Sequence, residues 1–175
     1  MKSTFRTLTK DEFPFVHSLM KLSFPPAEFR IYEEALALLN YPNYNILAAE
    51  EDGVLQAFIA EWVLKDIHFV EHFAVNPETR GQGLGTRIMR DYLAQTHPVV
   101  IEVEAEDTLI AKRRIAFYER LGFVQSGIEY LQPLLQTADS TVLLRLMHYP
   151  SALSAKALYN IKREIFDTVY NISHK

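Results

Sequence analysis

The sequence predicts a mixed α/β fold, and three observations support that prediction. Strand-like segments on both sides of the Asp52-Gly53 turn are typical of a β-hairpin. Between residues 67 and 105, a strand pattern, a glycine-rich helix start and a second, buried strand pattern follow one another. Apolar residues at three- and four-residue spacing over 151–172 indicate an amphipathic C-terminal helix.

The elements of the first part of the chain follow from local signals. Asp11 is expected to cap the first helix. Pro25-Pro26 should end it, because proline cannot continue the hydrogen-bond pattern of a helix. The expected order is a strand at 3–8, helices at 11–22 and 28–39, and strands at 44–50 and 54–64.

The second part of the chain is expected to complete the sheet. Gly122 should end a helix, since glycine readily takes the left-handed conformation that closes one. The stretch YLQPLL, residues 130–135, is expected to be a loop, and Ser151 is expected to cap the last helix. The expected order is a strand at 67–75, a helix at 83–95, a strand at 98–105, a helix at 107–120, strands at 123–127 and 141–147, and the helix at 151–172.

The composition limits the possible partners. The 175 residues, 49% of them hydrophobic, fit one domain over 1–175 with a full core. The net charge of -4 argues against nucleic acid as a partner. The absence of cysteine excludes disulfides, thiolate metal sites and a cysteine acyl-enzyme. The start has no signal-peptide pattern and no segment is long and apolar, so we expect a cytoplasmic location and no membrane partner. The apolar stripe of the last helix should pack on the same domain or form a dimer contact, which leaves a monomer or a homodimer open.

Three glycines in RGQGLGTRIM, residues 80–89, precede a helix and indicate an anion-binding loop. Alternating glycines let backbone amides turn towards a ligand, and the first turn of a helix has unpaired N–H groups at the positive end of its dipole. The P-loop pattern is absent, because no lysine follows Gly83. The dinucleotide fingerprint also fails, because Thr86 stands where its third glycine would be. The alternative is a glycine-rich helix start used only for packing.

Two segments of the chain resemble the Gcn5-related N-acetyltransferase (GNAT) family. Arg80, Gly83 and Gly85 match the family's acetyl-CoA loop, which has Arg or Gln, two residues, Gly, one residue, then Gly or Ala. The approach to this loop, FAVNPETRGQGLG, has the family's hydrophobic strand and Pro turn. The helix end RIAFYERLGF is similar to a family helix that ends in Tyr, three residues and Gly-Phe, with Tyr118 at the tyrosine position.

The resemblance covers about residues 67–123, the expected cofactor-binding core. It departs from the family at Ala111 and Arg114, where an asparagine and a small residue are usual. These departures put cofactor contacts from that part of the helix in question.

The resemblance implies a central mixed, mostly antiparallel sheet with helices on both faces and acetyl-CoA held where two central strands part. Amides of the glycine loop would hold the pyrophosphate, with Arg80 as a charge clamp. An amide near Phe73 or Ala74 would face the thioester carbonyl. The expected cofactor-binding residues are Phe73, Ala74, Val75, Arg80, Gly81, Gln82, Gly83, Leu84, Gly85 and Thr86.

Two carboxylates are candidates for the general base. Alternation in IHFVEHFAV places Glu71 on an apolar face, which predicts a strand bulge or a position in a cleft, and Glu71 is the leading candidate. Glu102 is the second candidate, and it lies on the polar face of the predicted strand VVIEVEAED. That face either looks into the substrate cleft, which would suit a base, or forms a solvated edge. In many members of the family the tyrosine that aligns with Tyr118 is the general acid; the alternative role is a core aromatic.

The predicted function is an N-acetyltransferase that moves an acetyl group from acetyl-CoA to a primary amine by direct transfer in a ternary complex. The acidic cleft favours a small cationic amine or an amine on a cationic peptide, with Glu104, Tyr130 and Gln132 as contacts. The alternative is a non-catalytic acyl-CoA-binding regulatory module. No metal is expected, because His68 and His72 lie too far apart along a strand to share one ion.

Overall fold

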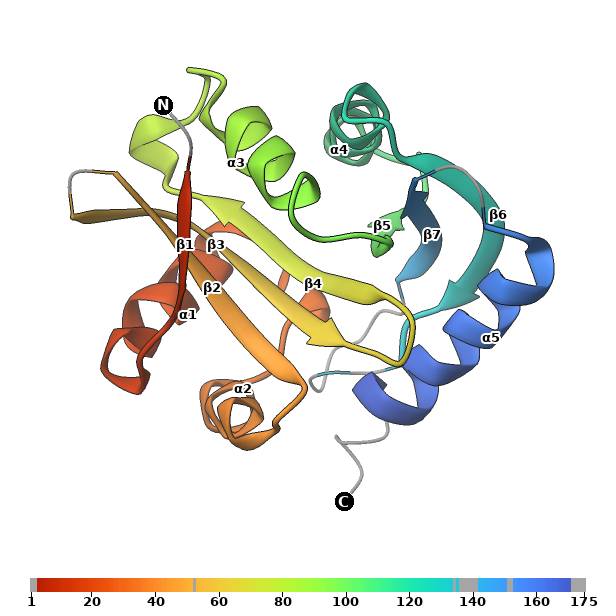
Figure 1. The fold of residues 1–175 in the computed structure, drawn as a ribbon, viewed down its shortest axis with the longest axis horizontal. Helices are drawn as coiled ribbons and strands as arrows, with labels where there is room; N and C mark the ends of the chain where they lie inside the picture. The colour runs from red at the N-terminus through yellow and green to blue at the C-terminus, as the bar shows by residue number, and fades with distance from the viewer. Residues whose placement is uncertain (1–2, 52, 134, 136–141, 151–152, 171–175) are drawn as a thin grey trace.

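The computed structural model describes residues 3–51, 53–133, 135, 142–150 and 153–170. These residues form a seven-stranded sheet with the order β1-β2-β3-β4-β5-β7-β6 (Figure 1). Neighbouring strands pair antiparallel, except that β4 and β5 are parallel. The prediction of a mixed, mostly antiparallel sheet is therefore confirmed. The strands are β1 Thr4–Thr7, β2 Tyr44–Glu51, β3 Val54–Val63, β4 His68–Val75, β5 Val99–Glu104, β6 Val124–Leu131 and β7 Leu143–Tyr149.

Helices cover both faces of the sheet, as predicted (Figure 1). Buried side chains of α1, α2 and α5 belong to one hydrophobic cluster, and those of α3 and α4 belong to a second cluster on the opposite face. Strand β3 lies between the two clusters, so its residues 57–62 are all buried rather than alternating. The helices are α1 Phe13–Ser23, α2 Tyr32–Ala37, α3 Leu84–Leu93, α4 Leu109–Arg120 and α5 Ala155–Ile165, and a π-helical turn, Phe166–Tyr170, continues α5.

The segment between α1 and α2 differs from the prediction of one helix over 28–39. A 3-10 turn, Pro26–Glu28, is followed by Phe29 in an extended conformation, and α2 begins only at Tyr32. Residues with extended backbone cannot continue a helix, so the chain changes direction here. This break is important for the site, because Glu28 and Arg30 both lie in it.

Three further boundaries differ from the predictions. Strand β6 extends to Leu131, so the start of YLQPLL is strand and not loop. The first helical segment is preceded by a 3-10 turn, where the backbone N–H of Thr9 donates to Glu12 at 2.9 Å, and Asp11 does not act as the cap. Ser154 caps α5 by accepting from the Ala157 N–H at 3.2 Å. The predicted residues Asp52, Thr141 and Ser151 lie outside the described residues.

The C-terminal helix packs on the same chain. Its apolar stripe is buried in the cluster that also holds α1 and α2, and comprises Leu158, Ile161, Ile165 and Val169. Ile172, the last residue of the predicted stripe, lies outside the described residues. The described stripe therefore needs no second subunit to cover it. Among the described residues, no helix has the length and apolar character needed to cross a bilayer.

Candidate active site

The site is built where β4 and β5 separate. These two strands pair only over three residues, from His68↔Val99 to Val70↔Ile101. Beyond that point β5 continues to pair with β7, while β4 continues with β3. A cavity of about 460 Å³ lies at the separation and is lined by residues of both strands and of α3 and α4.

A bulge on β4 directs Glu71 into this cavity. Ala60 pairs with His72 and Glu61 pairs with Val70, so Glu71 is an extra residue with no partner on β3. A bulge of this kind re-aims side chains and interrupts the ladder. Both outcomes that the sequence left open are thus found together, because Glu71 is on a bulge and lines the cavity.

The glycine loop forms the other edge of the cavity. Gly81 and Gly83 have φ values of 82° and 76°, in the left-handed region that favours glycine. Gly83 is the N-cap of α3, so the helix directs its unpaired first-turn amides towards the loop. A Cβ on Gly85 would lie 3.3 Å from Val75 Cγ2, which means that α3 approaches β4 closely. The arrangement is that of an anion-binding helix start.

Arg80 is held at the mouth of the cavity. Its Nε donates to the Val75 carbonyl at 3.0 Å, and its Nη2 donates to Ser23 Oγ at 2.9 Å. Of the ten predicted cofactor residues, Gln82 is absent from the described lining. The cavity wall contains the other predicted residues, which are Phe73, Ala74, Val75, Arg80, Gly81, Gly83, Leu84, Gly85 and Thr86.

Glu71 is bound by a cation. Arg30 Nη1 donates to its Oε1, and the Trp62 indole N–H donates to its Oε2 at 2.9 Å. Both side chains of the ion pair are about 95% or more buried. Burial is the largest single influence and raises the pKa of Glu71, but the charge of Arg30, the nearby His72 and the hydrogen bonds from Arg30 and Trp62 together hold that pKa below its ordinary value. A carboxylate in this state is a weak base.

Glu102 has different partners. Tyr130 OH donates to its Oε1, and Tyr170 OH donates to its Oε2 at 2.5 Å. Burial raises the pKa of Glu102 to about 7, although both phenols oppose the shift by binding the charged form. Nearby Glu71 adds to the rise. A carboxylate with this pKa exchanges protons near neutral pH.

Tyr118 lies on α4 and lines the cavity. Its ring makes edge-to-face contacts with Phe117 and Phe123, so it also belongs to the core. Burial raises the pKa of its phenol to about 12, and Arg114 opposes that shift. Tyr118 therefore keeps its proton at neutral pH, as a general acid must.

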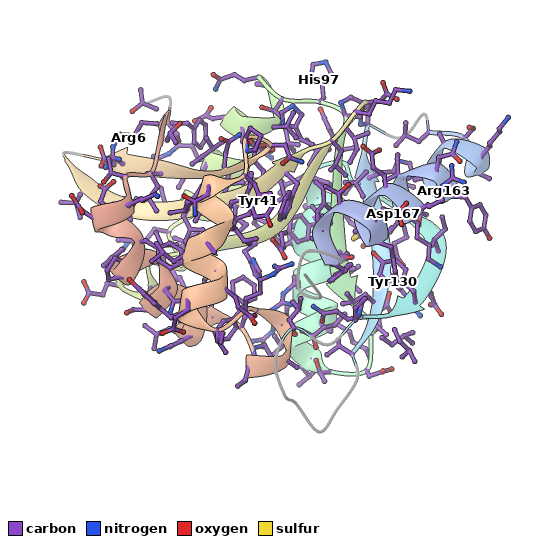
Figure 2. All side chains as sticks on the ribbon, turned by 90° about the horizontal axis from the view of Figure 1, so that it is seen from below. Arg6, Tyr41, His97, Tyr130, Arg163 and Asp167 are labelled. Atoms are coloured by element: carbon purple, nitrogen blue, oxygen red, sulfur yellow. The ribbon has the colours of Figure 1, made fainter. Side chains whose placement is uncertain are left out.

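The predicted acceptor contacts are divided between two layers. Glu104 and Gln132 line the cavity. Tyr130 is absent from the described lining and instead lies behind Glu102, with its ring 5.1 Å from that of Phe166. Figure 2 shows Tyr130 on the same side of the molecule as Arg163 and Asp167 of the C-terminal helix. Tyr130 thus contacts the carboxylate rather than the cavity.

Sequence reasoning missed four residues of the site. Glu28, Arg114 and Tyr170 line the cavity, and Arg30 lies beside it. Arg114, named only as a departure from the family pattern, donates to Glu104 at 2.9 Å and to Glu28 at 3.4 Å. The position of Glu71 on an apolar strand face indicates that a cation lies beside it. The sequence does not say which of its 18 lysines and arginines is that cation, so Arg30 could not be identified.

The separated parallel strands, the glycine loop at a helix start and the paired acid and base candidates define an acyltransferase domain. The family model described as Acetyltransferase (GNAT) domain matches residues 42–125. A solved GNAT-family structure from Bacteroides thetaiotaomicron is 30% identical, with a TM-score of 0.88 over 95% of this chain and 98% of that chain. The chain belongs to the GNAT acetyltransferase family.

Two other similar proteins are more distant. A Bacillus subtilis (strain 168) protein, provisionally named a [ribosomal protein bS18]-alanine N-acetyltransferase, is 30% identical over 51% of this chain and 58% of its own length. The chain spans little more than half the length of the curated relatives it matches. The structure of yncA from Salmonella typhimurium, which holds its cofactor acetyl-CoA, has a TM-score of 0.58 at 17% identity and covers 89% of this chain and 97% of its own. That last likeness concerns the fold.

Proposed function

We propose that the chain transfers an acetyl group from acetyl-CoA to a primary amine, by direct transfer in a ternary complex. The observation that carries the proposal is the position of Glu102. This partly buried carboxylate, with a pKa of about 7, opens onto the same cavity as Tyr118 and the first turn of α3. A proton acceptor, a proton donor and an anion-binding helix start thus surround one space.

The cofactor would lie along the α3 edge of this cavity. Gly81 and Gly83, with positive φ, and the first-turn amides of α3 suit a pyrophosphate. Acetyl-CoA bound there supplies the acetyl group as a reactive thioester. The Arg80 side chain at the mouth adds a positive charge for the phosphates.

We assign the base role to Glu102 in preference to Glu71, which reverses the order expected from sequence. Glu71 Oε1 and Oε2 are already bound by Arg30 and Trp62, and its pKa is lowered. Among the described residues, the hydrogen-bond donors to Glu102 are two neutral phenols, so a proton from the amine can be held on this carboxylate without breaking an ion pair. Tyr118 holds the phenolic proton that a departing thiolate requires.

The acceptor in this proposal is a cationic amine, either small or carried by a peptide. Glu28, Glu71, Glu102 and Glu104 line the cavity, against Arg80 and Arg114 as its lining cations. Arg30 already neutralises Glu71, so attraction of a protonated amine depends on Glu104 and on the ionised forms of Glu28 and Glu102, and the bound amine can then lose its proton to Glu102.

A screen for thiol release tests the proposal. Purified protein is mixed with acetyl-CoA and single amines, and free thiol is measured with and without each amine. Amine-dependent thiol release, with the acetylated amine identified by mass spectrometry, is the expected result. Tight acetyl-CoA binding without turnover of any amine would contradict the proposal and favour the non-catalytic acyl-CoA-binding module.

A further inference from the structure

The cavity wall contains buried polar atoms that lack partners. Glu28 Oε1, His72 Nδ1 and Gln132 Oε1 have no hydrogen-bond partner among the residues that the structure describes. All three side chains line the cavity, and each is about 90% or more buried. Buried polar groups are nearly always hydrogen bonded, so these atoms indicate that something else in the cavity binds them.

Two of these atoms belong to one corner of the cavity. The Glu28 carbonyl accepts from His72 Nε2 at 2.8 Å, which fixes the 3-10 turn against β4. A carbonyl only accepts, so Nε2 carries the proton, and burial lowers the pKa of His72, which keeps the ring neutral. The Nδ1 atom of this neutral ring is therefore an acceptor. The corner thus presents two unpaired acceptors, one on His72 and one on Glu28.

The same corner contains a carboxyl pair with a single cation. Arg114 Nη1 lies 2.9 Å from Glu104 Oε1 and 3.4 Å from Glu28 Oε2. The guanidinium stacks over Phe24 at 5.6 Å, which limits its movement. Burial raises the pKa of Glu28 to about 8, Glu104 adds to the rise, and Arg114 opposes it. One cation therefore does not fully compensate two carboxylates, and Glu28 binds a proton in the absence of another cation.

We propose that this corner, formed by Glu28, Glu104 and His72, binds a second ammonium group of the acceptor, so that the preferred acceptor class is a diamine. An ammonium group has three N–H donors and no acceptor, which matches the unpaired acceptors that His72 and an ionised Glu28 present. It would supply the missing positive charge, and it would displace the proton from Glu28. The proposal rests on the proposed function, in which the other amine of the same molecule faces Glu102.

The test compares matched acceptors. The value of kcat/KM is measured for putrescine and cadaverine, for the monoamines n-butylamine and n-pentylamine, and for amino alcohols of the same lengths. Wild type should prefer each diamine over its monoamine by about ten- to a hundredfold, the value of a charged hydrogen-bonded contact. The amino alcohols should resemble the monoamines, because they donate a hydrogen bond but carry no second charge.

Glu28→Gln should reduce the ratio of diamine to monoamine kcat/KM to near one, and Glu104→Gln provides the same test if Glu28→Gln does not fold. Glu34→Gln is the matched control, because Glu34 is exposed on the neighbouring α2 and its variant should keep the wild-type ratio. Equal turnover of diamines and monoamines, or a ratio unchanged in both site variants, would overturn the proposal while leaving the acetyltransferase function intact.

A binding measurement separates the two proposals. Calorimetry of cadaverine with wild type near pH 7, in two buffers that differ in ionisation enthalpy, should show proton release that is absent in Glu28→Gln. Diamine binding with this proton release, but without thiol release from acetyl-CoA, would support the corner and contradict the catalytic proposal. No binding of cadaverine at millimolar concentration would overturn the diamine inference.

Discussion

The two walls of the cavity are built in different ways. The wall formed by β4 and α3 uses backbone, with two glycines at positive φ and the amides of a helix start. The opposite wall, formed by the 3-10 turn, β5 and the C-terminal turn, uses charged and phenolic side chains from distant parts of the chain. We infer that the wall of β4 and α3 binds the cofactor through its shape and its fixed backbone dipoles. The opposite wall transfers protons, and its activity therefore depends on the protonation state of its side chains.

The contrast is sharpest between Glu71 and Glu102. Glu71, with a buried side chain, and Glu102, which is partly buried, lie on neighbouring strands at the point where the strands separate. A guanidinium binds Glu71 and lowers its pKa, whereas two neutral phenols bind Glu102 and leave its pKa at about 7. Burial is thus common to both sites, and the charge of the partner decides which carboxylate can act as a base.

The largest effect is expected for Glu102→Gln. The amide cannot accept the amine's proton, so kcat should fall by about a hundred- to ten-thousandfold while acetyl-CoA affinity stays at the wild-type value. Because the folded pKa is raised, ionising Glu102 costs stability as pH rises from the ordinary glutamate value towards 7. Removing that charge should not unfold the chain. Near-normal turnover in the variant would return Glu102 to a structural role.

Tyr118→Phe should have the second-largest effect on catalysis. Loss of the phenolic proton should lower kcat by about a hundredfold, and the retained ring should preserve the contacts with Phe117 and Phe123. Steady-state kinetics and acetyl-CoA titration measure the two quantities separately. A variant with wild-type kcat would show that the tyrosine is only a core aromatic.

Gly83→Val tests the backbone wall. At a φ of 76° a β-branched residue costs about 1–3 kcal/mol, so the loop should shift and the dissociation constant of acetyl-CoA should rise by about tenfold. At saturating cofactor, kcat should change little. Gly53→Val is the control, because Gly53 has a φ of 74° and lies in the β2–β3 turn. Equal affinity for acetyl-CoA in both variants would show that the glycine loop is not part of the cofactor-binding site.

Glu71→Gln should have the smallest effect on catalysis and a clear effect on stability. The amide leaves the Arg30 guanidinium buried without its counter-charge, so the free energy of unfolding should fall by about 3 kcal/mol. The depressed pKa of Glu71 means that its contribution is present above the ordinary glutamate value and is lost as pH falls through the folded pKa. Denaturant titrations at neutral and acidic pH measure this. A variant of unchanged stability but with kcat lowered a hundredfold would restore Glu71 as the base.

The features that the sequence predicted well are those with local signals. The glycine loop and the hairpin at Gly53 each follow from a few adjacent residues, and the bulge at Glu71 is one of the two outcomes that the local alternation allows. The placement of Glu102 and Glu104 on one side of β5 followed from strict alternation. Whether that side faced solvent or a cleft could not be read locally, because it depends on where β4 and β5 separate.

The features that the sequence missed depend on contacts between distant segments. Arg30 reaches Glu71 on β4 and the Val169 carbonyl in the C-terminal turn at 2.7 Å. Tyr170 falls within the predicted amphipathic helix over 151–172 but outside its apolar stripe, and nothing in the sequence indicates that its hydroxyl binds Glu102. The break after Glu28 has no strong local signal, because none of Phe29, Arg30 and Ile31 is a glycine or proline that would interrupt a helix.

The pH dependence of kcat/KM tests most directly whether Glu102 is the base. With a saturating acetyl-CoA concentration and one amine, wild-type kcat/KM should rise with pH through a limb near 7, in addition to the amine's own limb at about 10. Glu71→Gln should keep the limb near 7 and Glu102→Gln should lose it. A limb near 7 that persists in Glu102→Gln, or that disappears in Glu71→Gln, would contradict the account.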